Sequence, residues 1–571
     1  MTKMADAAAS MQQTDHVWER HYPQGVDWHA DIPKRSLIAL FDDAVARYGD
    51  KPFLEFLGKR YTYRQVSALV DRFAKGLQGL GVRKGRTVGL FLPNTPYFVI
   101  AYFGVLKAGG TVVNFNPLYA EREIAKQIDD SEATIMVTLD VKATYTKLAR
   151  MLVETRLEKI VVCPMADVLP FPKNWLFPFV RRQDLALIPH DAHHVRFREL
   201  TANDGRFTPV AIDPVEDVAV LQYTGGTTGV PKGAMLTHAN IYANTVQAAL
   251  WFPEAVDGAE RMLGVLPLFH VFAMTCVMNL TIYKGGEIVL LPRFDLDQVL
   301  ETIDRKKPTL FPAVPTIYTA INNHKHREKY DLSSIKLCNS GGAPLPVEVK
   351  AKFEEIAGCK LVEGYGLSES SPVATINPPD ASVPGSIGMP LPGTVIEIMS
   401  LEDRSRPVAL GERGEVCIRG PQVMKGYWKR PDETANTIVD GRLHTGDVGY
   451  MDERGYTYIV DRIKDMILAG GYNVYPRNVE EAIYLHPAVH ECIVLGVPDP
   501  YRGQTVKAYI RLGEGQQMTP EELKAFLKDK LSPIEMPKQV EFREELPKTM
   551  IGKLSRKALL DEMEAQGKAA G

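Results

Sequence analysis

Short apolar runs that alternate with helix-like segments constrain the fold of this chain more than any other feature. Residues 86–92 and 111–114 have the composition of buried strands, and Asn94 can cap a helix between them. Residues 133–138 form a third apolar run after a polar helical stretch. Strand, helix and strand at this spacing predict parallel sheets joined by crossover helices.

The length of 571 residues predicts more than one domain, because single cores stop growing at roughly 250–300 residues. After about residue 380, glycine and proline separate short alternating runs such as 414–419, which are typical of a small antiparallel or barrel-like sheet. A more charged unit begins after Asp461. We therefore expect a lead-in over 1–33, a large domain over 34–462 and a small mobile domain over 463–571.

The composition is that of an ordinary globular protein, with 45% apolar and 24% charged residues. The net charge of −3 and the lack of a long basic block argue against nucleic acid as a partner. The six cysteines are scattered and form no CxxC pair, which predicts reduced, buried thiols and a cytoplasmic location. The polar, alanine-rich first residues resemble a loosely ordered lead-in rather than a signal peptide.

Residues 169–182 combine aromatic and aliphatic side chains with two arginines. Two interpretations stay open: a loop held against the core, or a peripheral contact with the inner face of the cytoplasmic membrane. No stretch of the sequence reaches the roughly 18 apolar residues that a membrane span needs. A homodimer is a further option that the sequence leaves open.

Residues 223–233 read Tyr-Thr-Gly-Gly-Thr-Thr-Gly-Val-Pro-Lys-Gly, between an apolar run and a helix-like stretch. Exposed backbone N–H groups, hydroxyls and one ammonium favour a polyphosphate-binding loop, and a flexible surface loop is the alternative. The common nucleotide-binding loop needs Gly-Lys followed by Ser or Thr. Here Pro231 precedes Lys232 and Gly233 follows it, so this loop is of another kind.

Four further motifs follow in order, at residues 364–369, 445–447, 461–465 and 547–553. Each is weak alone, but together they resemble the adenylate-forming superfamily of acyl-CoA synthetases, luciferases and peptide-synthetase adenylation domains. The resemblance covers about residues 37–557. Residues 440–452 and 459–464 resemble the fatty acyl-CoA synthetase signature, and residues 421–428 and 472–476 the bacterial long-chain branch.

This resemblance implies an α/β fold. Its large N-terminal domain would hold two doubly wound α/β subdomains and a small distorted β-barrel, and a smaller mobile C-terminal α+β domain would follow. It also implies a ligase reaction in which a fatty-acid carboxylate attacks the α-phosphate of ATP and coenzyme A then displaces AMP. ATP, coenzyme A and Mg²⁺ are the implied co-substrates and metal.

Medium- to long-chain fatty acids are the expected substrates. An aryl or short-chain acid, transfer to a carrier protein, and a non-enzymatic membrane binder are the alternatives. We expect the acyl pocket near Trp251, Val373 and residues 269–274 and 311–317.

The resemblance also implies roles for individual residues. Lys553 would contact both the carboxylate and the α-phosphate, Glu369 and Thr224 would bind Mg²⁺, and His270 would serve either catalysis or pocket structure. Other residues would bind ATP or coenzyme A: the phosphates at Thr224, Gly226, Thr227, Thr228, Lys232 and Ser368; the adenine at Gly341, Gly342, Ala343, Tyr365 and Gly366; the ribose at Asp447 and Arg462; and the hinge and coenzyme A path at Lys464, Gly470 and Gly471.

Overall fold

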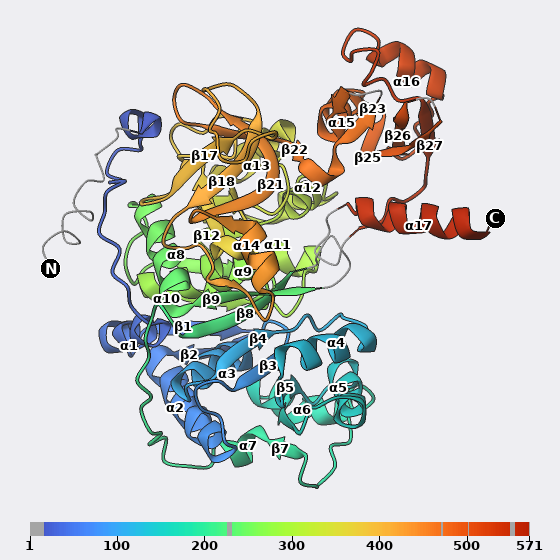
Figure 1. Ribbon diagram of the computed structural model, residues 1–571. Helices are drawn as coiled ribbons and strands as arrows, with labels where there is room; N and C mark the ends of the chain where they lie inside the picture. The colour runs from blue at the N-terminus through green and yellow to red at the C-terminus, as the bar shows by residue number, and fades with distance from the viewer. Residues whose placement is uncertain (1–15, 225–230, 470–471, 501, 549–553, 570–571) are drawn as a thin grey trace, which may run out of the picture.

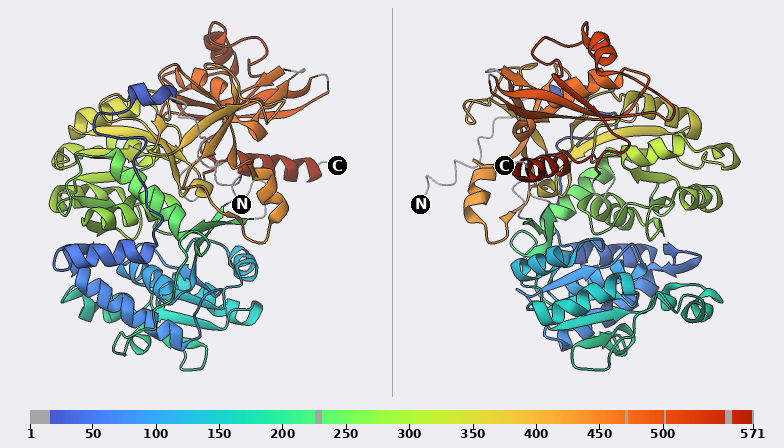
Figure 2. Two further views of the ribbon diagram at one scale, coloured as in Figure 1. Left: turned by 60° about the vertical axis from the view of Figure 1, so that its left-hand side comes forward. Right: turned by 90° about the vertical axis from the view of Figure 1, so that its right-hand side faces the viewer.

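The structure is a computed structural model that describes residues 16–224, 231–469, 472–500, 502–548 and 554–569. Two large sheets, a smaller curved sheet and a C-terminal unit make up the molecule (Figure 1). The C-terminal unit, in orange and red, lies at the upper right of the larger body in Figure 1. Figure 2 shows the same arrangement from two other sides.

The first large sheet has eight strands in the order β19-β9-β8-β4-β3-β5-β6-β7. Its strands β3 to β8 run parallel, and β9 and β19 pair antiparallel at one end. The bounds are β3 Thr87–Phe91, β4 Thr111–Asn114, β5 Ile135–Leu139, β6 Lys159–Cys163, β7 His194–Arg196, β8 Val218–Thr224, β9 Lys232–Thr237 and β19 Gly426–Tyr427. The three strands predicted from the apolar runs are confirmed.

Side chains of this sheet alternate between two cores, as the period of a strand requires. Val137 on β5 belongs to the core that contains α2 and α3, whereas its neighbour Met136 belongs to the core that contains α4 and α5. Helices therefore cover both faces, which is the doubly wound arrangement.

The second large sheet has nine strands in the order β16-β15-β14-β13-β12-β10-β11-β1-β2. Its interior strands are parallel, and β2, β15 and β16 pair antiparallel at the two ends. The bounds are β1 Pro52–Phe56, β2 Lys59–Thr62, β10 Arg261–Gly264, β11 Glu287–Leu290, β12 Leu310–Ala313, β13 Leu337–Ser340, β14 Lys360–Gly366, β15 Val373–Ile376 and β16 Met389–Pro390.

Most of the helices pack against the two large sheets, and their buried side chains belong to the same hydrophobic cores as those of the strands. Their bounds are α1 Leu37–Tyr48, α2 Tyr63–Gly79, α3 Pro96–Lys107, α4 Glu121–Ser131, α5 Lys142–Glu154, α6 Lys173–Val180, α7 Phe197–Leu200, α8 His238–Trp251, α9 Val271–Ala273, α10 Leu280–Lys284, α11 Leu296–Lys306, α12 Pro315–Asn322, α13 Val347–Ala357 and α14 Pro431–Thr437. A π-helical segment, Met274–Asn279, joins α9 to α10.

Asn94 does not cap the helix that follows it, contrary to expectation. Thr95 is the N-cap residue of α3, and Pro96 is its first helical residue. The Asn94 amide instead donates to the carbonyl oxygens of Gly264 and Leu266 at 3.2 and 2.8 Å. This buried side chain joins the two large sheets, so a tertiary contact replaces the local cap.

The small distorted β-barrel is an open curved sheet in this structure. Its strands are β17 Val395–Met399, β18 Gly414–Arg419, β20 Ile438–Val439, β21 Arg442–Met451 and β22 Thr457–Arg462, in the order β17-β18-β21-β20 with β22 also on β21. One edge of β21 pairs with β18. Along its other edge the first half of β21 pairs with β20 and the second half with β22, where the register shifts between Val448 and Gly449. The sheet therefore bends, but the described pairings do not close it.

The C-terminal unit has its own sheet and its own core, which includes Ile467, Val479 and Leu523. Its elements are β23 Ile467–Ala469, β24 Tyr472–Val474, α15 Pro476–Tyr484, β25 Val489–Asp499, β26 Gly503–Leu512, α16 Pro520–Leu527, β27 Gln539–Phe542 and α17 Arg556–Ala569. Thr519 caps α16 and Pro520 begins it, as the sequence predicts.

The expectation of a loosely ordered lead-in is wrong for residues 16–33. Trp18 is buried, and the Tyr22 hydroxyl donates to the carbonyl oxygen of Pro390 at 2.5 Å. The indole of Trp28 donates to the carbonyl oxygen of Thr394 at 3.0 Å. Aromatic side chains thus fix this segment to the large domain, a tertiary effect that polar composition hides.

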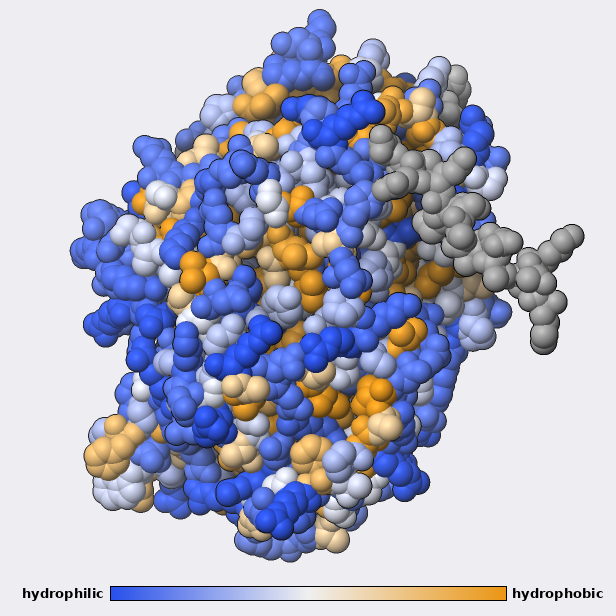
Figure 3. All heavy atoms as spheres, turned by 90° about the vertical axis from the view of Figure 1, so that its left-hand side faces the viewer, coloured by the Kyte–Doolittle hydropathy of each residue, from blue (hydrophilic) through white to orange (hydrophobic). Residues whose placement is uncertain are grey.

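The surface bears on the membrane interpretations. The face drawn in Figure 3 is mostly hydrophilic, with apolar residues in small separate patches. Within the described residues, no helix has both the length and the apolar character that crossing a bilayer requires. Residues 173–180 form helix α6, which has no buried residue and exposes Trp175 and Phe179.

All six cysteines are buried and free, as predicted.

Candidate functional site

A cavity of about 810 Å³ lies where both large sheets, the curved sheet and the start of the C-terminal unit meet. We call it the central cavity. It lies beyond the carboxyl ends of parallel strands, since Thr224 ends β8 and residues 341–342 follow β13, and this is where open α/β sheets bind ligands. Among the residues named from the sequence, its lining includes Thr224, Lys232, His270, Gly341, Gly342, Tyr365, Gly366, Ser368, Glu369, Arg462 and Lys464.

Asp447 lies behind this lining and is 3% exposed. The hydroxyl of Tyr365 donates to its Oδ2 at 2.5 Å, and Arg462 Nε lies 2.9 Å from its Oδ1. Burial raises the pKa of Asp447, and Arg462 opposes that shift. The three residues come from β14, β21 and the end of β22, so pairing of β21 with β22 brings two of them together.

Thr224 and Lys232 form the base of the glycine-rich loop. They face each other in the β8–β9 hairpin, and the Thr224 hydroxyl donates to the carbonyl oxygen of Lys232 at 3.5 Å. The loop therefore joins two strands, and helix α8 begins only after β9, because the segment after Lys232 pairs back onto β8. Gly226, Thr227 and Thr228 lie outside the described residues.

Two charged residues of the central cavity have partners that the sequence did not indicate. The Tyr427 hydroxyl donates to Oε1 of Glu369 at 2.7 Å. The Lys232 ammonium forms an ion pair with Glu433 and lies 5.3 Å from the centre of the Tyr427 ring. Tyr427 belongs to the edge strand β19, which pairs with β9, and Glu433 belongs to α14.

His270 begins the short helix α9, where its Nδ1 accepts from the Phe272 N–H at 3.3 Å. It lines the central cavity, which fits both of the roles expected for it. Lys464 also faces the cavity, and its partial burial lowers the pKa of its ammonium. Ala343 is half-buried just past the lining glycines. Lys553, Gly470 and Gly471 lie outside the described residues.

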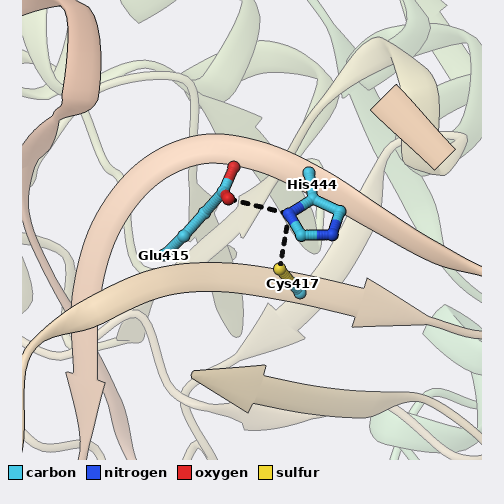
Figure 4. A group of neighbouring side chains, drawn as sticks. All are labelled: Glu415, Cys417 and His444. Atoms are coloured by element: carbon cyan, nitrogen blue, oxygen red, sulfur yellow. Dashed lines mark hydrogen bonds and ion pairs between the residues drawn. The ribbon is translucent and has the colours of Figure 1, made fainter. Parts of the chain in front are cut away.

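A buried group, Glu415, Cys417 and His444, was missed by sequence reasoning, and its Glu415 and His444 line the central cavity (Figure 4). His444 Nδ1 lies 2.7 Å from Glu415 Oε2 and 3.3 Å from Cys417 Sγ. Glu415 Oε1 also accepts from the N–H of Gly446 at 3.0 Å. Glutamate, cysteine and histidine are possible metal ligands, but these hydrogen bonds already account for the group as a support for the turn before Asp447. His444 lies inside the signature at 440–452, which was the available signal.

A second cavity, of about 40 Å³, is lined mostly by apolar side chains of α8, the π-helical segment, α10, β10, β12 and β13. Phe311, expected at the acyl pocket, lines it, whereas Val373, Val271 and Phe272 line the central cavity. Asn339 lines both cavities, and its buried Oδ1 accepts no hydrogen bond among the described residues. Trp251 instead packs its ring against Tyr22, with 5.2 Å between the ring centres.

Comparison with known proteins agrees with this geometry. The model of the AMP-binding enzyme family matches residues 41–428, and the model of the AMP-binding enzyme C-terminal domain matches residues 478–553. The chain is 47% identical to a long-chain-fatty-acid–CoA ligase of Bacillus subtilis, over 96% of this chain and 98% of the relative. It is 40% identical to a ligase of the same name from Escherichia coli O157:H7, over 97% of this chain and 99% of the relative.

Among solved structures, the anthranilate CoA ligase AuaEII in complex with anthranoyl-AMP is similar in fold. The TM-score is 0.81 at 28% identity, over 94% of this chain and 98% of that chain. Both family models match in their expected order along one chain, and together with the relatives they show that this protein belongs to the AMP-binding enzyme family.

Proposed function

We propose that this protein activates medium- to long-chain fatty acids to acyl-CoA with ATP, through an acyl-adenylate. In the first step a carboxylate oxygen attacks the α-phosphorus, and the bond to the β-phosphate breaks to release pyrophosphate. In the second step the sulfur of coenzyme A attacks the acyl carbonyl, AMP leaves, and the thiol proton is released. The central cavity carries the proposal, because Tyr365 and Arg462 hold the buried carboxylate of Asp447 at its wall, and Asn339 lines both this cavity and the smaller apolar one.

In this proposal the residues of the central cavity bind the nucleotide by complementary charge and shape. Tyr365 presents its ring to the adenine while its hydroxyl orients Asp447, whose carboxylate accepts from the ribose hydroxyls. Thr224 and Lys232 bind the β- and γ-phosphates at the base of their hairpin, with Ser368 as a further donor. Fixed donors of this kind stabilise developing negative charge without reorganisation.

Glu369 is the proposed ligand of Mg²⁺, with Thr224 as a second oxygen. The fit is good, because the Tyr427 hydroxyl fixes the direction of a carboxylate that lines the cavity, and Mg²⁺ prefers oxygen ligands. Bound there, Mg²⁺ would neutralise charge on the phosphates.

Residues 34–462 and 463–571 are proposed to act as two bodies. A separate apolar core in the C-terminal unit supports this division. Movement about Lys464 would bring Lys553 to the α-phosphate for the first step, and the Gly470–Gly471 segment to the coenzyme A path for the second.

The test of function is release of pyrophosphate and AMP, with and without coenzyme A, across carboxylic acids of increasing length. Turnover that depends on coenzyme A and is greatest for acids of about 12–18 carbons is the expected result, because each methylene that moves from water to apolar surroundings contributes roughly 0.8 kcal/mol. Turnover on aryl acids alone, as the name of the similar anthranilate ligase would suggest, would contradict the choice of substrate.

We further propose a cytoplasmic location with peripheral membrane contact through residues 169–182. Phe171, Trp175, Phe179 and Val180 are 85, 65, 70 and 74% exposed. Arg181 and Arg182 follow them; Arg181 forms an ion pair with Asp184, and Arg182 adds positive charge. Such a contact would give access to acids that partition into lipid.

Flotation with phosphatidylglycerol-containing vesicles tests this contact. Binding should fall in a Trp175→Ala, Phe179→Ala double variant and persist in Phe294→Ala, an exposed aromatic elsewhere. Equal binding of all three proteins would contradict the contact. The sequence also allows a homodimer, and light scattering of the purified chain would distinguish a dimer from a monomer by its mass.

A further inference from the structure

Lys232, the cation proposed to bind the phosphates of ATP, already forms an ion pair with a carboxylate of the protein. Its ammonium forms an ion pair with Glu433, and the two side chains are 23 and 37% exposed. The same ammonium lies 5.3 Å from the centre of the Tyr427 ring, whose hydroxyl donates to Glu369. One short segment, residues 427–433, thus contacts both charged groups proposed to act on the phosphates.

Several contacts fix this segment beside the glycine-rich loop. Tyr427 pairs with Ala234 in the β19–β9 ladder, and the N–H of Trp428 donates to the carbonyl oxygen of Gly233 at 2.8 Å. The side chain of Arg430, just before α14, donates to Oδ1 of Asp130 at 2.7 Å. Glu433 is therefore held near Lys232 by backbone pairing and by a second ion pair, and the contact is built into the fold.

Asp130 also ties the segment to the strand that leads into the loop, through its side chain and its backbone. Asp130 Oδ2 accepts from the Tyr223 hydroxyl at 2.5 Å, and the carbonyl oxygen of Asp130 accepts from the indole of Trp428 at 3.0 Å. Glu433 also has a second cation within reach, because its Oε1 lies 3.9 Å from Arg430 Nε. A carboxylate displaced from Lys232 could therefore turn to Arg430 without being left unpaired.

We infer that Glu433 is a positioning residue that occupies Lys232 in the absence of nucleotide and competes with the β- and γ-phosphates of ATP for it. The inference rests on the proposed role of Lys232 in phosphate binding. An ammonium has three donors, but the Glu433 carboxylate takes up part of them and repels the phosphates, so removing its charge should tighten ATP binding. A partly exposed pair is modest in energy, and its loss should change ATP affinity by about two- to fivefold.

The test compares Glu433→Gln with the matched control Asp432→Asn, which removes the same charge one residue earlier on α14. The dissociation constant of ATP, measured by calorimetry without fatty acid, should fall about two- to fivefold in Glu433→Gln and stay unchanged in the control. The KM for ATP should fall in parallel with kcat unchanged. AMP should bind both variants as it binds the parent protein, because it lacks the β- and γ-phosphates.

The background variant Lys232→Met separates the inference from the proposed function. In that background Glu433→Gln should no longer change ATP affinity, as a double-mutant cycle requires for a direct pair. An unchanged or weaker affinity in Glu433→Gln alone, or an equal gain for AMP, would overturn the inference. If Lys232→Met itself bound ATP as tightly as the parent, the role of Lys232 would fail instead, whatever Glu433 does.

Discussion

The hydroxyl of Tyr365 donates to Asp447 at 2.5 Å, although the two residues come from different sheets of the large domain. Arg462 engages the other oxygen of the same carboxylate. The ring of Tyr365 is therefore fixed at the cavity wall, and Asp447 is oriented before any ligand arrives. Preorganisation of this kind reduces the entropy lost on binding.

Tyr365→Phe keeps the ring but removes the donor to Asp447. We expect the KM for ATP to rise about tenfold with little change in kcat. One hydrogen bond to a charged group contributes about 1.5 kcal/mol, which corresponds to roughly a tenfold change in affinity. Steady-state kinetics with ATP as the varied substrate measures this. A large loss of kcat with an unchanged KM would contradict a role in nucleotide binding.

Lys553→Ala should abolish adenylate formation yet largely spare thioester formation from supplied acyl-AMP. The lysine is proposed to stabilise charge only while the carboxylate meets the α-phosphate, which is the first step. Pyrophosphate release and acyl-CoA formation are measured separately. Lys548→Ala, which removes a lysine paired with Glu491, is the control and should keep both steps. Equal loss of both half-reactions in Lys553→Ala would refute the division.

Glu369→Gln should raise the Mg²⁺ concentration needed for half-maximal activity by about tenfold or more, since a neutral amide is a poorer ligand for a hard cation. Titration of activity with MgCl₂ at saturating ATP measures the shift. Tyr427→Phe should produce a smaller change in the same direction, because it only releases the carboxylate from its hydrogen bond. If Glu369→Gln responds to Mg²⁺ as the parent does, another residue holds the metal.

Glu363, which precedes the Gly364–Gly366 segment on β14, makes stability depend on pH. Burial raises the pKa of its carboxyl to about 7, against the opposing charge of Arg477. The folded state then holds a proton that the unfolded state loses near pH 4.5, so stability falls as pH rises from about 4.5 to 7 and stays reduced above.

Glu363→Gln should therefore raise the melting temperature at pH 8 relative to the parent and leave it nearly unchanged at pH 5. The pKa difference sets an upper limit of about 3 kcal/mol on the gain. Glu355→Gln, at an exposed position on α13, is the control and should change neither value. A gain that is the same at both pH values would contradict ionisation of Glu363 as the cause.

Local patterns predicted much of the fold. The apolar runs at β3, β4 and β5 and the capped start of α16 are short-range signals, and the structure has all four. The predictions that failed depend on distant contacts. Asn94 could not be distinguished from a helix cap, because its partners Gly264 and Leu266 lie far along the chain. The curved sheet was expected to close, but β21 divides its pairing between β20 and β22.

The sequence by itself determined the family and many of the side chains that line the central cavity, because ordered motifs carry both in their residue types. Which of those side chains meet was decided only by the tertiary structure. Tyr427 reaches Glu369, Glu433 reaches Lys232, and His444 reaches Glu415 through strand pairing and helix placement between separate elements. Such contacts have no period along the chain, so the sequence contains the partners but not the pairs.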